Sequence, residues 1–280
     1  MRRVRSLWWV GLAAGLAATV IVLVGTRPGG TTAAAPAPPP AAQPPAAPSA
    51  APSAAPSAAP SAAPSAAPSA APPPAVEVAF RYLPLWPFDS VADAAEWQQE
   101  ANPGGHQPWH LSAELTALAF TNGYLQFTTV DRALSTKVRG DQAWVTVGYR
   151  LPNGADSAAA VLHLTLIGRG DQRPWEVVGS EDTTLSLTTP AYGARVSSPV
   201  TAGGRITGVD ESLRVQVRGT ASTAPLGEVA GIAAGGQNRP WSATVPFAAA
   251  DGTVRTLVVS TASHINEGIG RFAITGVRVG

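Results

Sequence analysis

The chain of 280 residues contains no cysteine and carries a formal net charge of +1 at pH 7. The missing cysteines exclude disulfide bonds, thiolate metal ligands, a cysteine nucleophile and a lipid-modified N-terminal cysteine. Four of the 19 basic residues precede residue 28 and all 18 acidic residues follow residue 75, so residues 76–280 hold 15 basic against 18 acidic side chains, a net charge of −3. An acidic exterior does not attract nucleic acid, and no nucleic-acid partner is expected.

Residues 1–27 have the features of a membrane anchor. Residues 7–25 carry no charged side chain and would form a helix of about 28 Å, which is long enough to span a bilayer. Three arginines precede this run and only Arg27 follows it, so the positive-inside rule places the N-terminus in the cytoplasm and the rest of the chain outside. We predict a single-pass signal-anchor in the cell membrane.

A cleaved signal peptide is the alternative interpretation of the same segment. Such a peptide has a shorter apolar core and a small-x-small cleavage site directly behind it. Here the nearest Ala-Ala-Ala, residues 33–35, lies well beyond the apolar run. Both observations favour an anchor that is not cleaved.

Gly11 and Gly15 lie four residues apart in the predicted span, the small-xxx-small spacing that lets two membrane helices approach closely. They are candidate contacts of a homodimer formed through the transmembrane helix. Gly and Ala are abundant in this chain, so the spacing arises easily by chance, and a monomeric anchor is the simpler interpretation.

Residues 28–75 are predicted to be a disordered spacer. Residues 46–69 consist of six consecutive copies of Ala-Ala-Pro-Ser, and the whole segment has no charged or aromatic residue. Proline at every fourth position removes backbone donors and prevents a helix or a packed core. The spacer would reach about 150 Å as extended polyproline II and about 40 Å as a flexible coil.

Residues 76–184 are predicted to begin with two helices. Ser90, followed three residues later by Asp93, is a weak capping box for a first helix, and the Pro-Gly-Gly of residues 103–105 would stop it. Apolar residues at helical spacing predict a second helix over residues 112–126, with Leu115 on its buried face.

Strands are expected to follow these helices. Alternating apolar residues predict strands over residues 143–151 and 161–167 with a turn at residues 152–154 between them, and residues 175–178 form a further apolar run. Helices that cover one face of an antiparallel meander make an α+β domain. We expect a cone of the NTF2-like kind.

Residues 185–280 are predicted to form an all-β sandwich with an immunoglobulin-like arrangement that lacks the cysteine pair. In this part apolar residues no longer recur at helical spacing, and short apolar stretches are separated by Gly, Pro and Asp. The predicted strands are residues 201–207, 213–218, 241–247, 253–260 and 271–279.

The stretches TPAYGARVSSPV (residues 189–200), ESLRVQV (residues 211–217) and WSATVPF (residues 241–247) resemble the Gmad2 immunoglobulin-like domain of bacterial spore-germination and envelope proteins. The resemblance covers residues 185–280. It implies a sandwich fold and a link to sporulation or germination, and the family has no catalytic residues to transfer. The Ala- and Gly-rich residues 230–237 depart from the compact pattern of that domain.

Four stretches of the middle region stand out: WQQE (97–100), PWH (108–110), AFTNGY (119–124) and PWEVVG (174–179). They are similar to an uncharacterised actinobacterial membrane-anchored envelope domain, from which no activity follows. Arginine far outnumbers lysine in the whole chain, and Ala, Gly and Pro dominate, which is typical of a GC-rich genome.

His106 and His110 are four residues apart near Glu100 and Glu114, a combination that suits zinc. The prolines and glycines around them disfavour a helix in this segment, so the two rings would not share a helix face. No metal site is predicted. Gln107, Trp109 and His110 are instead candidate ligand or partner contacts. Pro-Trp pairs occur at residues 108–109, 174–175 and 240–241, and their tryptophans could stack on sugar rings. Packing is the simpler explanation, because tryptophan buries a large apolar area.

Arg-Gly-Asp-Gln occurs at residues 139–142 and again at residues 169–172. Receptor recognition is one interpretation of this motif. A tight hairpin turn is the simpler one, because Gly-Asp is what such a turn requires and no partner is needed.

The sequence predicts neither catalytic residues nor a cofactor, and we expect a protein that is not an enzyme. The expected function is that of a membrane-anchored extracytoplasmic binding or structural module of the bacterial cell envelope. Its expected partners are the cytoplasmic membrane and an envelope protein or wall component. Two alternatives stay open: the α+β domain binds a lipid or wall precursor between its helices and sheet, or the chain is a cell-wall hydrolase that uses His110.

Overall fold

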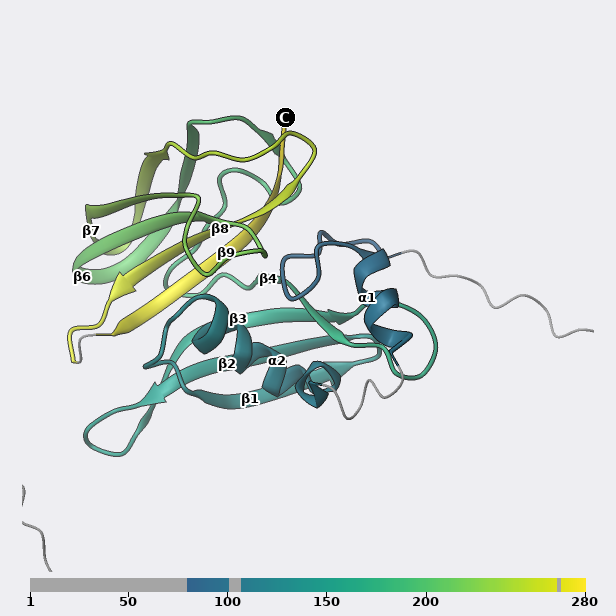
Figure 1. The fold of residues 1–280 in the computed structure, drawn as a ribbon. Coiled ribbons are helices and arrows are strands. Elements are labelled where there is room, and N and C mark those ends of the chain that lie inside the picture. Colours follow the sequence, from purple (N-terminus) through teal and green to yellow (C-terminus); the bar gives the residue numbers. More distant parts are fainter. Residues whose placement is uncertain (1–79, 101–106, 266–267) are drawn as a thin grey trace, which may run out of the picture. The chain divides into compact units, whose positions relative to one another are not determined.

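The computed structural model describes residues 80–100, 107–265 and 268–280, which belong to one compact unit, Pro72–Gly280 (Figure 1). This part of the chain is mostly β-sheet with few helices, consistent with a β-sandwich. None of its helices is long and apolar enough to cross a bilayer. The predicted membrane span with Gly11 and Gly15, and the predicted spacer, lie outside the described residues.

Two helical segments follow capping residues that the sequence marks. In α1 (Val91–Gln98) the Ser90 hydroxyl accepts a hydrogen bond from the Asp93 amide at 3.1 Å, which confirms the predicted cap. The second helical segment consists of η1 (Pro108–Leu111), a 3₁₀ turn, then α2 (Ala113–Leu118) and η2 (Ala119–Tyr124), a π-helical turn.

The buried face of this second segment differs from the prediction. Leu115 is 50% exposed, whereas Ala117, which the predicted stripe did not include, is fully buried; Phe120, which the predicted stripe did include, is buried as expected. Small residues, Ala113 and Ala117, face the sheet and let the helix approach it closely, so the buried stripe is rotated away from Leu115. Helical spacing alone predicted that Leu115 would be buried, and this prediction is wrong.

Four antiparallel strands make the first sheet, in the order β1-β2-β3-β4. They are β1 (Arg132–Arg139), β2 (Gln142–Arg150), β3 (Asp156–Leu166) and β4 (Trp175–Ser180). Ala143, Val145 and Val147 are buried on one face together with Phe120, which confirms the predicted alternation in β2. The edge strand β1 was not predicted, because its residues are half or fully exposed and lack an apolar alternation.

The second sheet has five strands in the order β5-β9-β8-β6-β7. They are β5 (Arg195–Val196), β6 (Val200–Arg218), β7 (Gly227–Val245), β8 (Val254–Ala262) and β9 (Ile269–Val279). The two strands predicted over residues 201–207 and 213–218 are one continuous strand, β6. Residues 230–237, set apart in the sequence as a departure from the Gmad2 pattern, lie within β7.

The hairpin of β6 and β7 takes part in two layers. The C-terminal half of β6, residues 213–218, pairs with β8 on one side and β7 on the other. The N-terminal half pairs with the end of β7 and forms bridges from Gly203 to Thr189 and from Ile206 to Leu185. Apolar side chains of both halves meet in one core.

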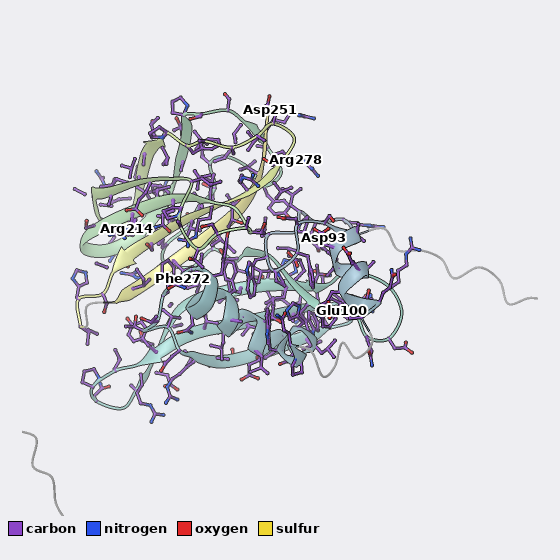
Figure 2. The ribbon with its side chains drawn as sticks, viewed as in Figure 1. Asp93, Glu100, Arg214, Asp251, Phe272 and Arg278 are labelled. Atoms are coloured by element: carbon purple, nitrogen blue, oxygen red, sulfur yellow. The ribbon has the colours of Figure 1, made fainter. Side chains whose placement is uncertain are left out.

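Strands β8 and β9 are buried on both faces. Leu257, Val259 and Ala273 pack in the core shared with the β6–β7 hairpin. Their neighbours in sequence, Val258, Phe272 and Ile274, belong instead to the core that contains α2 and the four-stranded sheet. Figure 2 shows Phe272 on the part of β9 that faces the helices, and its ring lies 5.3 Å from that of Phe127. A single sheet therefore serves two cores.

Gly204 occupies a point of close approach in this half of the chain. A Cβ atom at residue 204 would overlap the carbonyl oxygen of Ser186, a backbone atom that cannot rotate away. We expect Gly204→Ala to lower the free energy of unfolding by about 2 kcal/mol in a urea titration. Gly179→Ala is the matched control, because its Cβ would meet no atom within 4 Å. Equal losses in the two variants would contradict the packing argument.

Candidate functional site

The three candidate contacts named from the sequence lie in and beside the turn η1 (Pro108–Leu111). Gln107 is exposed and caps η1 with a left-handed backbone at φ 54°. Trp109 stacks on Trp86 with ring centroids 5.3 Å apart, and the buried ring of His110 stacks on Trp97 at 4.9 Å. Trp109 and His110 thus take part in aromatic packing, and none of the three residues lines the hollows described next.

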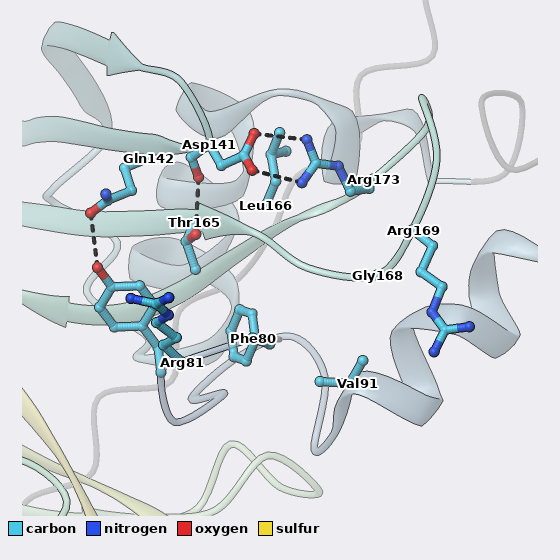
Figure 3. Close-up of a pocket in the computed structure, with 11 residues that line it drawn as sticks. Phe80, Arg81, Val91, Asp141, Gln142, Thr165, Leu166, Gly168, Arg169 and Arg173 are labelled. Carbon is cyan, nitrogen blue, oxygen red and sulfur yellow. Dashed lines mark hydrogen bonds and ion pairs between the residues drawn. The ribbon is translucent and has the colours of Figure 1, made fainter. Parts of the chain in front are cut away.

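The site that the geometry favours is a hollow of about 440 Å³, which we call the arginine hollow (Figure 3). It lies on the face of the four-stranded sheet opposite α2, because Gln142 and Thr165 pair across β2 and β3 and alternate with the buried Ala143 and Leu164. Its lining comes from four segments of the chain. The residues are Phe80, Arg81, Tyr82, Val91, Asp141, Gln142, Thr165, Leu166, Gly168, Arg169 and Arg173.

Both Arg-Gly-Asp-Gln segments contribute to this hollow. In the first, Arg139 pairs with Gln142 and Gly140 has φ 58°, so Gly140 and Asp141 form the two-residue turn between β1 and β2 that the sequence predicts. The second copy was also predicted to be a tight hairpin turn, but it lies in the longer connection of residues 167–174 between β3 and β4, where Arg169 lines the hollow. The repeated motif could have indicated this site, because residues of both copies line the same hollow. Each copy on its own predicts only a turn.

An ion pair joins the β1–β2 turn to the connection between β3 and β4. The Asp141 carboxylate accepts one hydrogen bond from each terminal nitrogen of Arg173, at 2.9 and 2.7 Å. This hydrogen bonding lowers the pKa of Asp141 below its ordinary value and raises the pKa of Arg173, so both groups are charged at neutral pH. The bidentate geometry fixes the plane of the Arg173 guanidinium at the rim of the hollow.

The connection between β3 and β4 is held from a second side by Gln98 at the end of α1. The Gln98 amide donates to the carbonyl oxygens of Arg169 and Gln172 at 2.7 and 2.8 Å, and its oxygen accepts from the Arg169 backbone amide at 3.0 Å. Gly168 has φ +88°, and a Cβ there would overlap the Gln98 side chain. These contacts position an exposed, glycine-containing loop that adds little to the core.

The opposite wall of the hollow is aromatic. The Tyr82 hydroxyl donates to Gln142 Oε1 at 2.9 Å, and His163 Nε2 lies 2.9 Å from the same oxygen. The His163 ring stacks on Trp144 at 5.0 Å and meets Tyr82 edge-on at 5.2 Å. Burial lowers the pKa of His163, with Glu181 opposing, so the neutral ring with its proton on Nε2 suits this contact.

The hollow is locally basic. Three guanidinium groups and one carboxylate in its lining give a formal charge of +2, although residues 76–280 carry −3 as a whole. The Tyr82 hydroxyl donates to Gln142, and the Thr165 hydroxyl donates to the Asp141 carbonyl oxygen at 2.9 Å. Because both hydroxyls donate to protein oxygens, neither offers its proton to a ligand, and the guanidinium groups are the charged donors of the lining.

Three further hollows adjoin the same segments. One of about 750 Å³ lies between α1 and the connection from β3 to β4, and it shares Val91, Gly168 and Arg169 with the arginine hollow. Two more, of about 640 and 340 Å³, share Tyr82 with it. No α2 residue lines any of the four hollows, and Ala117 and Phe120 are fully buried where α2 meets the sheet.

Among residues 80–100, 107–265 and 268–280, no group of three metal-binding side chains is placed to hold a metal ion. No protein-family model matches the chain, and no curated protein matches it. The function must therefore be inferred from the residues and their geometry.

Proposed function

We propose that the protein is a membrane-anchored binding module of the bacterial cell envelope, held outside the cytoplasmic membrane, with the arginine hollow as its ligand site. The observation that carries this proposal is that residues of both Arg-Gly-Asp-Gln segments line one hollow, whose lining has a formal charge of +2. A volume of about 440 Å³ is in the range of ligand sites, and the lining combines apolar walls with a few convergent polar groups. The proposed activity is binding without catalysis.

The proposed mechanism depends on tethering. The anchor of residues 1–27 would confine the hollow to a shell near the membrane, and the spacer of residues 28–75 would set the thickness of that shell. Confinement raises the effective concentration of the module toward envelope components in the same layer. A homodimer through Gly11 and Gly15 would place two hollows in one assembly.

The proposal includes a fold type for each of the two regions that follow the spacer. An immunoglobulin-like sandwich of the Gmad2 kind over residues 185–280 is supported by the long β6–β7 hairpin, which takes part in two layers around one core. An NTF2-like arrangement over residues 76–184 is supported by an antiparallel sheet with helices on one face. A role in sporulation or germination rests on the resemblance to Gmad2 domains.

Binding of a small molecule within the α+β domain is the second candidate function. The arginine hollow favours it, because its lining lies wholly in residues 80–173. In this version the ligand would bind the sheet face opposite α2, and not the interface between helices and sheet.

Photo-crosslinking in intact cells tests the proposal. A photoreactive phenylalanine analogue in place of Phe80, within the hollow, should capture an envelope component, and trypsin added to spheroplasts should cleave residues 76–280. The same analogue in place of Val138, which is 57% exposed on β1 outside the hollow, is the control. Equal capture from both positions, or protection of residues 76–280 in spheroplasts, would contradict the proposal.

A further inference from the structure

We propose that a second hollow binds a small aliphatic carboxylate, with the apolar body of the ligand inside the hollow and its carboxylate against Arg255. This hollow has a volume of about 640 Å³, in the range of ligand sites, and we call it the junction hollow. Its lining comes from residues 80–91, the connection between β6 and β7, the start of β8 and the end of β9. It contains no residue of either Arg-Gly-Asp-Gln segment, so its ligand is independent of the arginine hollow.

Arg255 has hydrogen-bond donors that the protein does not use. Its Nη1 donates to the Val254 carbonyl oxygen at 2.6 Å, whereas its Nε is withdrawn from solvent and meets no acceptor in the part of the chain that the structure describes. A buried donor without an acceptor is unfavourable, and a ligand oxygen would supply the missing partner. A carboxylate can accept from Nε and Nη2 together, because a guanidinium presents these donors side by side.

Gly219 leaves room beside this donor. A Cβ atom added to Gly219 would lie 3.4 Å from Leu226 Cδ1 and 3.5 Å from both Cζ and Nε of Arg255, and apart from its neighbours in the chain it would meet nothing closer. These distances are ordinary van der Waals contacts, so no other side chain fills the position next to Nε. Because Gly219, Leu226 and Arg255 all line the junction hollow, this position lies on its wall.

The charge of the lining favours a ligand with a single negative charge. Arg255 and Arg278 bring two positive charges and Asp89 brings one negative charge, which gives a formal charge of +1. Within the described ranges neither arginine forms an ion pair, and the Asp89 carboxylate accepts a hydrogen bond from the Thr220 hydroxyl. One carboxylate, ionised at neutral pH, would therefore neutralise the hollow. The direct contact is assigned to Arg255 alone, and Arg278 contributes charge.

The remaining wall is suited to an aliphatic body. Its apolar side chains are those of Phe80, Tyr82, Pro84, Val91, Leu226 and Val254. A hydrocarbon chain that covers them removes apolar surface from water. The wall is also held in place without a ligand, because the Leu226 amide donates to the Val217 carbonyl oxygen at 2.8 Å and the contact of Thr220 with Asp89 ties the β6–β7 connection to the entering segment. A site that is already ordered lowers the cost of binding.

Ligand-observed NMR on the full chain in phosphatidylcholine nanodiscs tests the ligand class, with empty nanodiscs to subtract partition of the probes into lipid. Titrations followed by saturation transfer should show that hexanoate binds more tightly than hexanol, which has no charge, and than hexylammonium, which has the opposite charge. Hexyl phosphate, with a charge between about −1.5 and −2, should also bind more weakly than hexanoate. Equal binding of hexanoate and hexanol, or tighter binding of hexyl phosphate, would overturn the assignment of a carboxylate.

Two variants test the position of the site by different physical routes. Arg255→Gln removes the charge and the Nε donor and should weaken hexanoate binding by about tenfold or more. Gly219→Ala places a methyl group beside Nε without a clash, so its urea midpoint should stay close to that of the unmodified chain while hexanoate binding weakens by a similar factor. Neither residue lines the arginine hollow, so both variants leave that site intact.

Matched controls complete the experiment. Gly179→Ala adds a methyl group that meets no atom within 4 Å, and Arg214→Gln removes an exposed arginine of β6, both outside the junction hollow. Both controls should bind hexanoate like the unmodified chain. Unchanged hexanoate binding in Arg255→Gln or in Gly219→Ala, or an equal loss in the controls, would overturn the proposed site.

Discussion

Glu176→Ala is expected to lower the free energy of unfolding by about 3 kcal/mol. Glu176 is completely buried on β4, and its two carboxylate oxygens accept hydrogen bonds from the backbone amides of Trp86 and Phe88, at 2.6 and 3.2 Å. The alanine would leave both amides without these acceptors and would leave a cavity, and each lost partner of a buried group costs about 1–3 kcal/mol. Urea titration of the full chain in detergent micelles, followed by tryptophan fluorescence, measures the loss.

The same carboxyl group makes stability depend on pH. Burial raises the pKa of Glu176 well above its ordinary value, although the amides of Phe88 and Trp86 oppose the shift. Between the ordinary pKa and the raised one, the folded state binds a proton that the unfolded state has released, so this contribution to stability is complete below the ordinary pKa and is lost as pH rises through the raised pKa. Glu176→Gln cannot titrate and should lack this part of the pH dependence.

Glu96→Gln is the matched control for both Glu176 variants, because Glu96 is exposed on α1. Its free energy of unfolding should differ from that of the unmodified chain by no more than about 0.5 kcal/mol. The account of Glu176 would fail if Glu176→Ala cost no more than Glu96→Gln, or if Glu176→Gln kept the full pH dependence.

Arg218→Ala is expected to cost about 3 kcal/mol, the second large effect. Arg218 is 2% exposed on β6 and donates to the carbonyl oxygens of Tyr124 and Thr223 and to Gln216 Oε1. Its Cζ atom also lies 5.2 Å from the centre of the Tyr124 ring. Because Tyr124 ends η2, one buried side chain joins the helical segment to the second sheet, and its loss would leave buried carbonyl groups without donors.

Arg214→Ala is the control for Arg218→Ala, because it removes an exposed arginine from the same strand. Arg214, labelled in Figure 2, also lies on β6. Its side chain is 54% exposed, and its Nε lies 3.7 Å from Glu228. An exposed ion pair of this kind contributes about 0–1 kcal/mol. In urea titrations of both variants we expect a loss several times larger for Arg218→Ala. Similar losses would show that burial of Arg218 adds nothing.

Local signals predicted the parts of the fold that depend on local chemistry. The Ser90 cap, the alternation of Ala143, Val145 and Val147, and the turn at Gly140 follow from properties of short segments, and the structure confirms all three. The buried face of α2 could not be obtained this way. It depends on how closely the helix approaches the sheet, which the size of Ala117 permits and the periodicity of leucines does not encode.

The arginine hollow was predictable only in part, for a similar reason. Each Arg-Gly-Asp-Gln segment could be assigned to a turn, but Asp141 and Arg173 are brought together by strand order, which the sequence did not show. No sequence signal identified Gln98 as a residue that positions the hollow, because its partners are backbone atoms of a distant loop. Trp109 and His110 drew attention as unusual residues, yet in the fold their rings pack against other aromatic rings.

Because β8 and β9 are buried on both faces, few of their residues can be replaced without loss of packing. A strand such as β2 has exposed or half-exposed positions between its buried ones, and those positions accept polar replacements. In β8, six consecutive residues from 256 to 261 are buried, with alternate side chains directed into different cores. Amino-acid variation along β8 should therefore be restricted at every position, and a single inserted residue would exchange the contents of both cores at once.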